Sequence, residues 1–139
     1  MVNASDIQIR VIHSADTEDV VRLYKAAGWW EKHYVAEAFI PPMVKNSACF
    51  AGAFDGEHMV GMGRAVSDNV SDAYIQDIVV LPEYRGQGIG GKIVKVLISE
   101  LKARGVDWIG LVGEPGTGEF YARLGFKPLK GFIPMKLDE

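Results

Sequence analysis

The chain has 139 residues, of which 48% are hydrophobic and 24% are charged, and its formal net charge is −3. These values predict one globular domain over residues 1–139. They disfavour nucleic acid as a partner, because surfaces that bind it are usually strongly basic. The chain has one cysteine, so we expect no internal disulfide. It has no signal-like start and no apolar run of membrane-spanning length, so we expect a cytoplasmic protein that does not act at membranes.

The N-terminal third predicts one strand and two helices. Apolar and polar residues alternate over 7–11, which is typical of a short strand. A helix over residues 17–27 follows, with Asp16 as its cap and Gly28 as its stop. We expect a second helix over residues 29–40, ended by the two consecutive prolines that come next.

The middle of the chain predicts a hairpin followed by a strand and a long helix. Apolar runs over residues 48–54 and 58–66 flank an Asp-Gly turn, which is a strong hairpin signal. The most β-branched run covers residues 74–81 and predicts a strand. After a glycine-rich stretch, residues 89–104 carry apolar side chains at helical spacing and predict an amphipathic helix.

The last third predicts a strand over residues 108–112, a short helix over 118–124, and one or two closing strands over 126–137. The order is therefore strand, two helices, three strands, helix, strand, helix and strand. A hairpin followed by a strand-helix-strand unit predicts a mixed, mostly antiparallel sheet with helices on both faces, in the α+β class with α/β-type layering.

The most informative segment joins the strand 74–81 to the long helix. After a Pro-Glu-Tyr turn the chain reads R-G-Q-G-I-G-G over residues 85–91. Glycines at the start of a helix leave backbone N–H groups uncovered at its positive end, where phosphate groups bind well. This junction predicts a site for a phosphorylated ligand.

Two ligands are compatible with the glycines. Residues 86–91 satisfy G-x-G-x-x-G, the dinucleotide fingerprint, and Glu114 ends the following strand. A dinucleotide loop, however, turns directly out of its strand, whereas four residues intervene here, and too little chain follows to complete such a fold. A bound NAD is therefore the weaker interpretation.

The other interpretation starts at Arg85. Arg-x-x-Gly-x-Gly resembles the pyrophosphate-binding motif of the GNAT superfamily of acyl-CoA-dependent N-acetyltransferases. The resemblance extends over residues 77–91, which look like motif A of that family, and over 120–126 (F-Y-A-R-L-G-F), which look like motif B. The G-M-G-R stretch over 61–64 is similar to a strand of the same family. The resemblance thus covers nearly the whole chain.

The resemblance implies a sheet that is splayed in a V, with acetyl-CoA as the co-substrate in the opening. The three histidines are scattered along the chain, and their spacing does not suggest a metal site. The backbone of the splayed strand would pair with the pantetheine arm, and the Ile78 N–H would face the thioester carbonyl. The positions that match the family's cofactor-binding segment are Ile78, Val79, Val80, Arg85, Gly86, Gln87, Gly88, Ile89, Gly90 and Gly91.

The catalytic candidates are a proton donor and a base. The resemblance implies that Tyr121 protonates the leaving thiolate, whereas a tyrosine on a short helix is otherwise usually a packing residue. Asp77 is an acid inside an apolar strand; it could take the proton of the amine, or it could pair with a buried arginine such as Arg64. Glu114 is the second candidate base.

The acceptor would be a small primary amine, for instance an amino sugar or an amino acid, whose nitrogen attacks the thioester directly in a ternary complex. Trp29 and Trp30 would border its pocket and favour an apolar or aromatic amine, although packing also explains them. Tyr74 is expected on the Ile78 face of its strand, at a position where family members sometimes place a base. Cys49 is expected in the core. A homodimer and a CoA-binding module without turnover are further possibilities.

Overall fold

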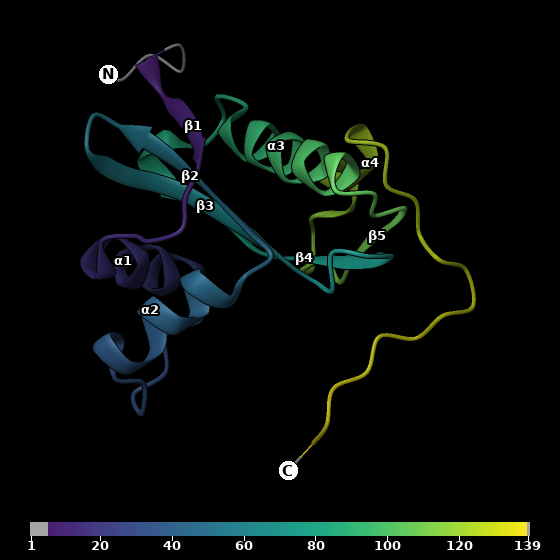
Figure 1. Cartoon of the computed structure of the whole chain (residues 1–139), viewed down its shortest axis with the longest axis horizontal. Helices are drawn as coiled ribbons and strands as arrows, with labels where there is room; N and C mark the ends of the chain where they lie inside the picture. The colour runs from purple at the N-terminus through teal and green to yellow at the C-terminus, as the bar shows by residue number, and fades with distance from the viewer. Residues whose placement is uncertain (1–5, 139) are drawn as a thin grey trace.

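The computed structural model describes residues 6–138. Five strands form one sheet in the order β1-β2-β3-β4-β5; β1 to β4 pair antiparallel and β5 pairs parallel with β4. Helices α1 and α2 lie on one face of this sheet, and α3 and α4 lie on the other (Figure 1). The elements are β1 (Gln8–Val11), α1 (Thr17–Ala27), α2 (Ala36–Asn46), β2 (Cys49–Asp55), β3 (His58–Ser67), β4 (Asp72–Val80), the 3-10 turn η2 (Pro82–Tyr84), α3 (Ile89–Ala103), β5 (Trp108–Leu111) and α4 (Gly118–Arg123).

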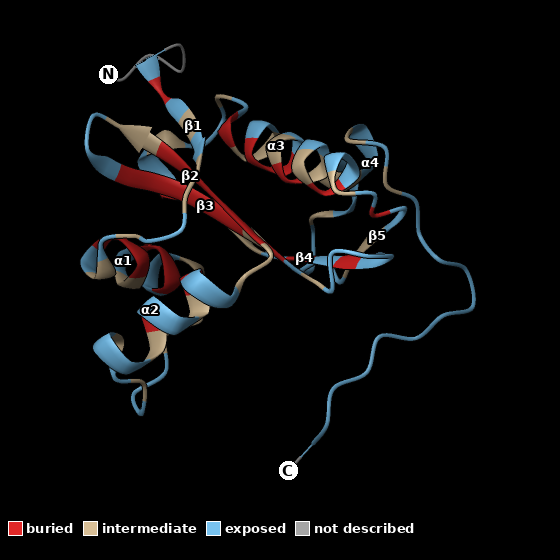
Figure 2. Cartoon of the chain, viewed as in Figure 1, coloured by how far each residue is buried: buried red, intermediate tan, exposed pale blue. Residues whose placement is uncertain are grey.

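The core lies between α3 and the sheet and continues beneath α1 (Figure 2). Helix α3 buries one stripe at helical spacing, because every third or fourth side chain falls on the same face. The stripe consists of Ile89, Ile93, Val94, Leu97 and Leu101. Gly105 follows with a φ of 90°, a conformation that glycine adopts without strain, and ends the helix.

Helix α1 spans the predicted residues and has the predicted ends. The Asp16 side chain accepts from the N–H groups of Glu18 and Asp19, at 2.9 and 3.2 Å, and Gly28 is left-handed with a φ of 80°. Asp19 is buried at 4% exposure. Its carboxylate accepts from the Met59 N–H at 3.1 Å and from Arg22 at 2.9 Å. The β2–β3 register shifts beside Phe54, which pairs with Met59, so Asp19 ties α1 to an irregular point of the hairpin.

Replacing Asp19 with alanine should lower the free energy of unfolding by about 1–2 kcal/mol, because a buried backbone N–H then loses its acceptor. Urea denaturation monitored by circular dichroism measures this loss. The Asp19→Asn variant keeps an acceptor oxygen and should lose clearly less. Equal losses in the two variants would show that the hydrogen bond to Met59 contributes nothing.

The second predicted helix is displaced along the chain. Residues 29–35 form turns, and α2 begins at Ala36 and continues through both Pro41 and Pro42. Prolines usually end a helix because they lack an N–H and crowd the preceding turn. Here the helix continues, and Ile40 and Val44, four residues apart, are buried by it against the rest of the core. Their burial offsets the two missing hydrogen bonds.

The closing strands predicted for residues 126–137 are wrong. The described residues after Phe126 contain turns and extended chain but no strand, and they run away from the sheet (Figure 1). The other predicted strands are confirmed to within about two residues. A strand needs a partner for its backbone hydrogen bonds, and none of the described strands pairs with these residues.

The sheet opens between its last two strands. β5 pairs with β4 only from Asp72 to Ile75, so the second half of β4 has β3 on one side and no strand on the other. This is the predicted splay. None of the helices within residues 6–138 has the length and apolar character needed to cross a membrane.

Candidate functional site

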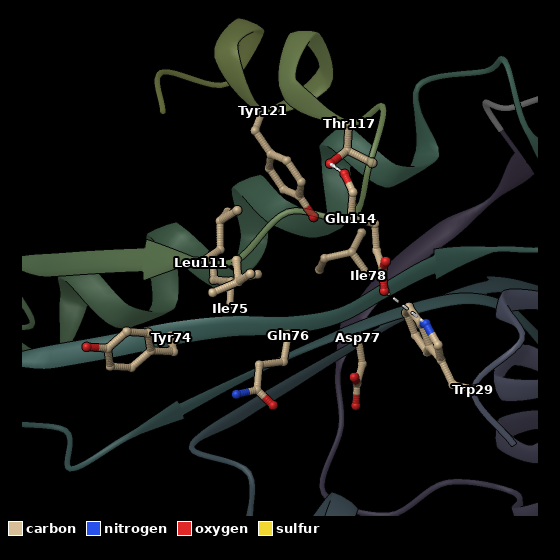
Figure 3. A pocket seen from close by; sticks show the side chains of 11 residues that line it. Trp29, Tyr74, Ile75, Gln76, Asp77, Ile78, Leu111, Glu114, Thr117 and Tyr121 are labelled. Atoms are coloured by element: carbon tan, nitrogen blue, oxygen red, sulfur yellow. Dashed lines mark hydrogen bonds between the residues drawn. The ribbon is translucent and has the colours of Figure 1, made fainter. Parts of the chain in front are cut away.

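A cavity of about 330 Å³ occupies the opening between β4 and β5. Its walls come from the end of α1, from β4, from β5 and from the segment leading into α4 (Figure 3). The lining residues are Trp29, Tyr74, Ile75, Gln76, Asp77, Ile78, Leu111, Val112, Glu114, Thr117 and Tyr121. Trp29 and Tyr121, more than ninety positions apart in the chain, therefore share one site, and both candidate bases and the candidate acid are among the lining residues.

A β-bulge in β4 shapes the floor of this cavity. Met62 pairs with Val79 and Arg64 pairs with Gln76, so only one residue of β3 opposes two of β4. Asp77, one of these two, has a φ of 58°, which is unusual for a residue other than glycine. Figure 3 shows the consequence: the side chains of Gln76 and Asp77 point to one side of the strand, and that of Ile78 points to the other.

The bulge corrects one prediction. Simple alternation placed Tyr74 and Gln76 on the same face as Ile78, but the extra residue reverses the faces after Gln76 (Figure 3). Ile78 instead packs toward α3: a Cβ added to Gly63 would lie 2.3 Å from the Ile78 side chain and 2.9 Å from that of Ile93. A larger residue at position 63 would therefore clash with Ile78 and Ile93.

Asp77 is held by two donors. Its Oδ2 accepts from the Tyr24 hydroxyl at 2.6 Å and from Nε of Arg64 at 2.7 Å. The Arg64 guanidinium also donates to Gln76 at 3.2 Å. Burial and the Asp77 hydrogen bond raise the pKa of Tyr24, so this hydroxyl remains a donor at any physiological pH. The pairing with Arg64 was one of the two sequence-based alternatives; Tyr24 lies 53 positions from Asp77, and no local pattern pointed to it.

Tyr121 projects from α4 into the cavity. Its ring packs edge-to-face on Phe120 and Phe126, with centroids 4.8 and 5.8 Å away, and its hydroxyl points toward Ile78 (Figure 3). Burial, followed by the negative charge of Glu114, raises the pKa of this phenol. Tyr121 therefore both packs against neighbouring rings and lines the cavity.

Glu114 follows β5 and reaches the cavity from the opposite side to β4. Its Oε1 accepts from Nε1 of Trp29 at 3.2 Å, a contact that links α1 to the segment before α4 (Figure 3). The Thr117 hydroxyl donates to the Glu114 backbone carbonyl at 2.6 Å and fixes the turn that carries it. Thr117 was not predicted as a site residue.

Of the three aromatic residues predicted to border the acceptor site, two line the cavity and one does not. Trp29 and Tyr74 line the cavity. Trp30 is not among the lining residues and packs against Tyr34 and Phe39, with ring centroids 5.2 and 6.0 Å away. Packing therefore accounts for Trp30, and the structure gives no support for its contact with an acceptor.

The glycine loop follows the unpaired half of β4 after the turn η2. Gly86 and Gly88 both have a φ of 80°, and a Cβ added to either would meet no atom within 4 Å. The first backbone hydrogen bond of α3 runs from the Lys92 N–H to the Gly88 carbonyl, at 3.2 Å. The preceding amides have no helical acceptor, and the Cβ positions of Gly86 and Gly88 lie in open space, an arrangement that suits a diphosphate.

Other residues of the loop have packing roles. Arg85 donates from Nε to the Val80 carbonyl at 2.8 Å. A Cβ at Gly90 would lie 3.3 Å from the Phe120 ring, so this glycine also lets α4 approach α3. The side-chain oxygen of Gln87 is buried and has no hydrogen-bond partner among the described residues.

The described residues outside the cavity meet the requirements of neither a metal site nor a nucleophilic thiol. Within residues 6–138, no three His, Cys, Asp or Glu side chains lie close enough together to hold a metal ion. Cys49 is buried at the start of β2, as expected, and burial raises the pKa of its thiol.

Comparison with known proteins agrees with this geometry. Residues 10–126 match the family described as "Acetyltransferase (GNAT) family". An uncharacterized N-acetyltransferase, ycf52, of Pyropia yezoensis is 40% identical over 129 residues, which cover 90% of this chain and 72% of that protein. A GCN5-related N-acetyltransferase of Arabidopsis thaliana chloroplasts is 41% identical over 69 residues, half of this chain, but this match covers only 27% of the longer plant protein.

Among solved structures, an acetyltransferase of the same family from Streptococcus pneumoniae TIGR4 superposes with a TM-score of 0.81 at 30% identity. The match covers 96% of this chain and 98% of that one. A glucosamine-6-phosphate N-acetyltransferase from Arabidopsis thaliana has a TM-score of 0.71 at 17% identity, which shows the shared fold alone.

Proposed function

This chain belongs to the GNAT family of acetyltransferases, and from that premise we propose that it transfers the acetyl group of acetyl-CoA to the nitrogen of a small primary amine. One observation carries the proposal. A single cavity holds a phenol, Tyr121, and a carboxylate, Glu114, beside the unpaired half of β4, and the glycine loop follows at the end of that strand. Acid, base and co-substrate site are thus contiguous.

The chain's own residues fit the co-substrate. The amides between Gly86 and Gly91 would bind the diphosphate, and the unpaired edge of β4 from Ile78 to Val80 would pair with the pantetheine arm. Bound there, acetyl-CoA supplies an activated acetyl group. The Ile78 N–H would donate to the thioester oxygen as negative charge develops on it.

Tyr121 would act as the general acid. Its hydroxyl points into the cavity toward Ile78, where the thioester would lie (Figure 3). Because its pKa is raised, the phenol keeps its proton at neutral pH and can give it to the departing thiolate.

Glu114 is the better candidate for the general base. Both Asp77 and Glu114 line the cavity, but Asp77 is already hydrogen-bonded to Tyr24 and Arg64. A proton taken by Asp77 would weaken both contacts. Glu114 accepts one hydrogen bond, from Trp29, and the second oxygen of its carboxylate is free to accept from the amine.

The walls indicate the acceptor class. Trp29 and Tyr74 offer aromatic faces, and Glu114 offers a negative charge at the same cavity. This combination favours a cationic amine on an aromatic or apolar body. A serotonin N-acetyltransferase of Oryza sativa chloroplasts is 39% identical over 67 residues, 34% of its length, and its name describes such an acceptor. For the present chain we propose an acceptor of this chemical class and not serotonin itself.

Ligand-induced stabilisation tests the co-substrate directly. We expect acetyl-CoA and CoA to raise Tm by several degrees at about 100 times Kd, where binding adds about 2.7 kcal/mol, and ATP and NAD to leave it unchanged. Release of free thiol from acetyl-CoA across a panel of amines then measures turnover. A shift with NAD alone would overturn the proposal, and binding without turnover on any amine would favour a CoA-binding module.

Two glycines give a matched pair for this experiment. Gly28 and Gly88 both have a φ of 80° and open space at the Cβ position, but only Gly88 lies in the loop. Gly28→Ala and Gly88→Ala should therefore lose similar stability, about 1–2 kcal/mol, from the strained conformation. Only Gly88→Ala should also raise the Kd for CoA, by about tenfold or more, because its methyl group enters the diphosphate space. Equal CoA affinity in both variants would remove the loop from the binding site.

A further inference from the structure

Trp29 brings the end of α1 to a cavity whose other walls come from later in the chain. All other residues that line the cavity lie between positions 74 and 121. Across this separation, Nε1 of Trp29 donates to Oε1 of Glu114 at 3.2 Å (Figure 3). Among the described residues, the Glu114 side chain makes no ion pair and no second hydrogen bond. The indole is therefore the group that holds this carboxylate.

An orienting contact matters for Glu114 because the residue is exposed. A glutamate side chain has several rotatable bonds, and without a contact it adopts many orientations. A general base must lie within hydrogen-bond reach of the proton that it removes, in a narrow range of directions. The indole N–H is a donor only, so it can orient a carboxylate without competing for the proton of the amine.

The end of α1 fixes the position of Trp29. The Trp29 N–H donates to the Tyr24 carbonyl at 2.9 Å, and the N–H of the left-handed Gly28 donates to the Lys25 carbonyl at 3.1 Å. These two bonds together form the Schellman motif, which closes a helix at a glycine. The Tyr24 ring also meets the indole edge-to-face, with centroids 5.9 Å apart. Backbone and side-chain contacts thus both hold the indole.

Tyr24 connects this arrangement to the second carboxylate of the cavity. The residue is buried at 5% exposure, and its hydroxyl donates to Oδ2 of Asp77 at 2.6 Å. A continuous series of contacts therefore runs from Asp77 through Tyr24 and Trp29 to Glu114. The bulge in β4, the end of α1 and the segment before α4 are positioned together.

The indole also keeps the candidate base apart from the candidate acid. The negative charge of Glu114 contributes to the raised pKa of Tyr121, so the two groups are close enough to interact. No hydrogen bond joins their side chains in the described structure, and Glu114 is directed to Trp29 instead (Figure 3). A carboxylate that accepted from the Tyr121 hydroxyl would withdraw both groups from the substrates.

We propose that Trp29 is a positioning residue for the general base: its N–H holds one oxygen of Glu114 so that the other oxygen faces the amine. The inference rests on the proposed function, in which Glu114 takes the proton. It separates two parts of one side chain. The ring face of Trp29 borders the acceptor, and its nitrogen orients the base.

Nuclear magnetic resonance tests the contact without any turnover. The chain has three tryptophans, at positions 29, 30 and 108, and hence three indole N–H signals. Spectra of Trp30→Phe and Trp108→Phe identify two of them, which leaves the third for Trp29. Glu114→Gln should move the Trp29 signal to higher field, because a neutral amide oxygen is a weaker acceptor than a carboxylate. The other two signals should stay in place.

A double-mutant cycle tests the positioning role. Trp29→Phe keeps an aromatic ring but removes the N–H, and it should lower kcat/KM by about tenfold in the unaltered chain. In the Glu114→Gln chain the same change should lower kcat/KM by less than twofold, because the base that Trp29 orients is already absent. Any loss through direct contact with the acceptor would persist in both chains, so the cycle separates the two roles.

Trp30→Phe is the matched control. Trp30 is the next residue in the chain and packs against Tyr34 and Phe39, but it does not line the cavity. This variant should keep kcat/KM within twofold. A circular dichroism melt of each variant measures the loss of stability that accompanies the change of ring.

Three results would overturn the inference and leave acetyl transfer intact: a Trp29 signal that ignores Glu114→Gln, a Trp29→Phe loss of equal size in both chains, or an equal loss in Trp30→Phe. Full kcat/KM in Glu114→Gln would remove both the base and its positioning residue. Failure of the proposed function is seen separately, as a missing Tm shift with CoA or as no thiol release by the unaltered chain with any amine.

Discussion

Replacing Tyr121 with phenylalanine should lower kcat for acetyl transfer by about 100-fold and change the Kd for acetyl-CoA by less than twofold. General acid catalysis by a positioned side chain contributes about 10²–10⁴-fold, and phenylalanine removes only the proton donor. The ring contacts with Phe120 and Phe126 remain, so the fold and the cavity wall are kept. Thiol release at saturating amine measures kcat, and calorimetric titration measures Kd.

The pH dependence gives an independent readout. An ordinary tyrosine loses its proton near pH 10, and burial together with Glu114 moves the pKa of Tyr121 upward. The proton-donor form therefore persists above pH 10, and kcat of the unaltered enzyme should show no decline between pH 7 and 10 from this group. A decline in that range that disappears in Tyr121→Phe would contradict the raised pKa.

Tyr84→Phe controls for the loss of a hydroxyl as such. Tyr84 lies in η2, next to the glycine loop, and its hydroxyl donates to Asp55 at 2.7 Å, outside the cavity. This variant should keep kcat while losing some stability. If both tyrosine variants retained full kcat, the thiolate would have another proton donor, and the role assigned to Tyr121 would be wrong.

Replacing Asp77 with alanine should have the largest effect on stability, about 2–3 kcal/mol, and should also abolish most of the turnover. The change leaves the Arg64 guanidinium and the Tyr24 hydroxyl without their acceptor, in a site where Asp77 and Arg64 are only about one-fifth exposed. Alanine is also strained in the left-handed backbone conformation at this position, which lowers the stability further. Urea denaturation and thiol release measure the two effects.

Asp77→Asn distinguishes a positioning role from a catalytic one. Asparagine tolerates a positive φ and its oxygen still accepts from Arg64, so the bulge should persist and kcat should fall by no more than about fivefold. An asparagine cannot take a proton at neutral pH, so a loss of turnover like that of the alanine variant, with the stability retained, would identify Asp77 as the base.

Glu114→Gln completes the comparison. If Glu114 takes the proton of the amine, this variant should lose at least about 100-fold in kcat/KM. Asp77→Asn should keep most of its kcat/KM. The reverse result would exchange the roles of the two carboxylates without changing the proposed reaction.

Local patterns in the sequence were sufficient for most elements. Asp16 and Gly28 are correct ends of α1 because capping and the left-handed stop depend on a few neighbouring atoms. The glycine loop likewise lies between β4 and α3 as predicted, since strand, turn and helix signals follow each other directly in the chain. The candidate site residues Tyr121 and the glycine loop could be predicted because each lies within a short family motif that can be recognised in the sequence.

Three features depend on contacts between residues that are distant in the sequence. Helix α2 continues through its two prolines because distant side chains bury Ile40 and Val44. The conformation and contacts of Asp77 depend on the bulge and on Tyr24, and neither can be recognised from the periodicity of the sequence. Residues 127–138 carry a strand-like pattern but have no strand beside them. Local sequence therefore limits which elements each segment can form, whereas pairing and burial, which depend on residues far away in the chain, select the element that forms.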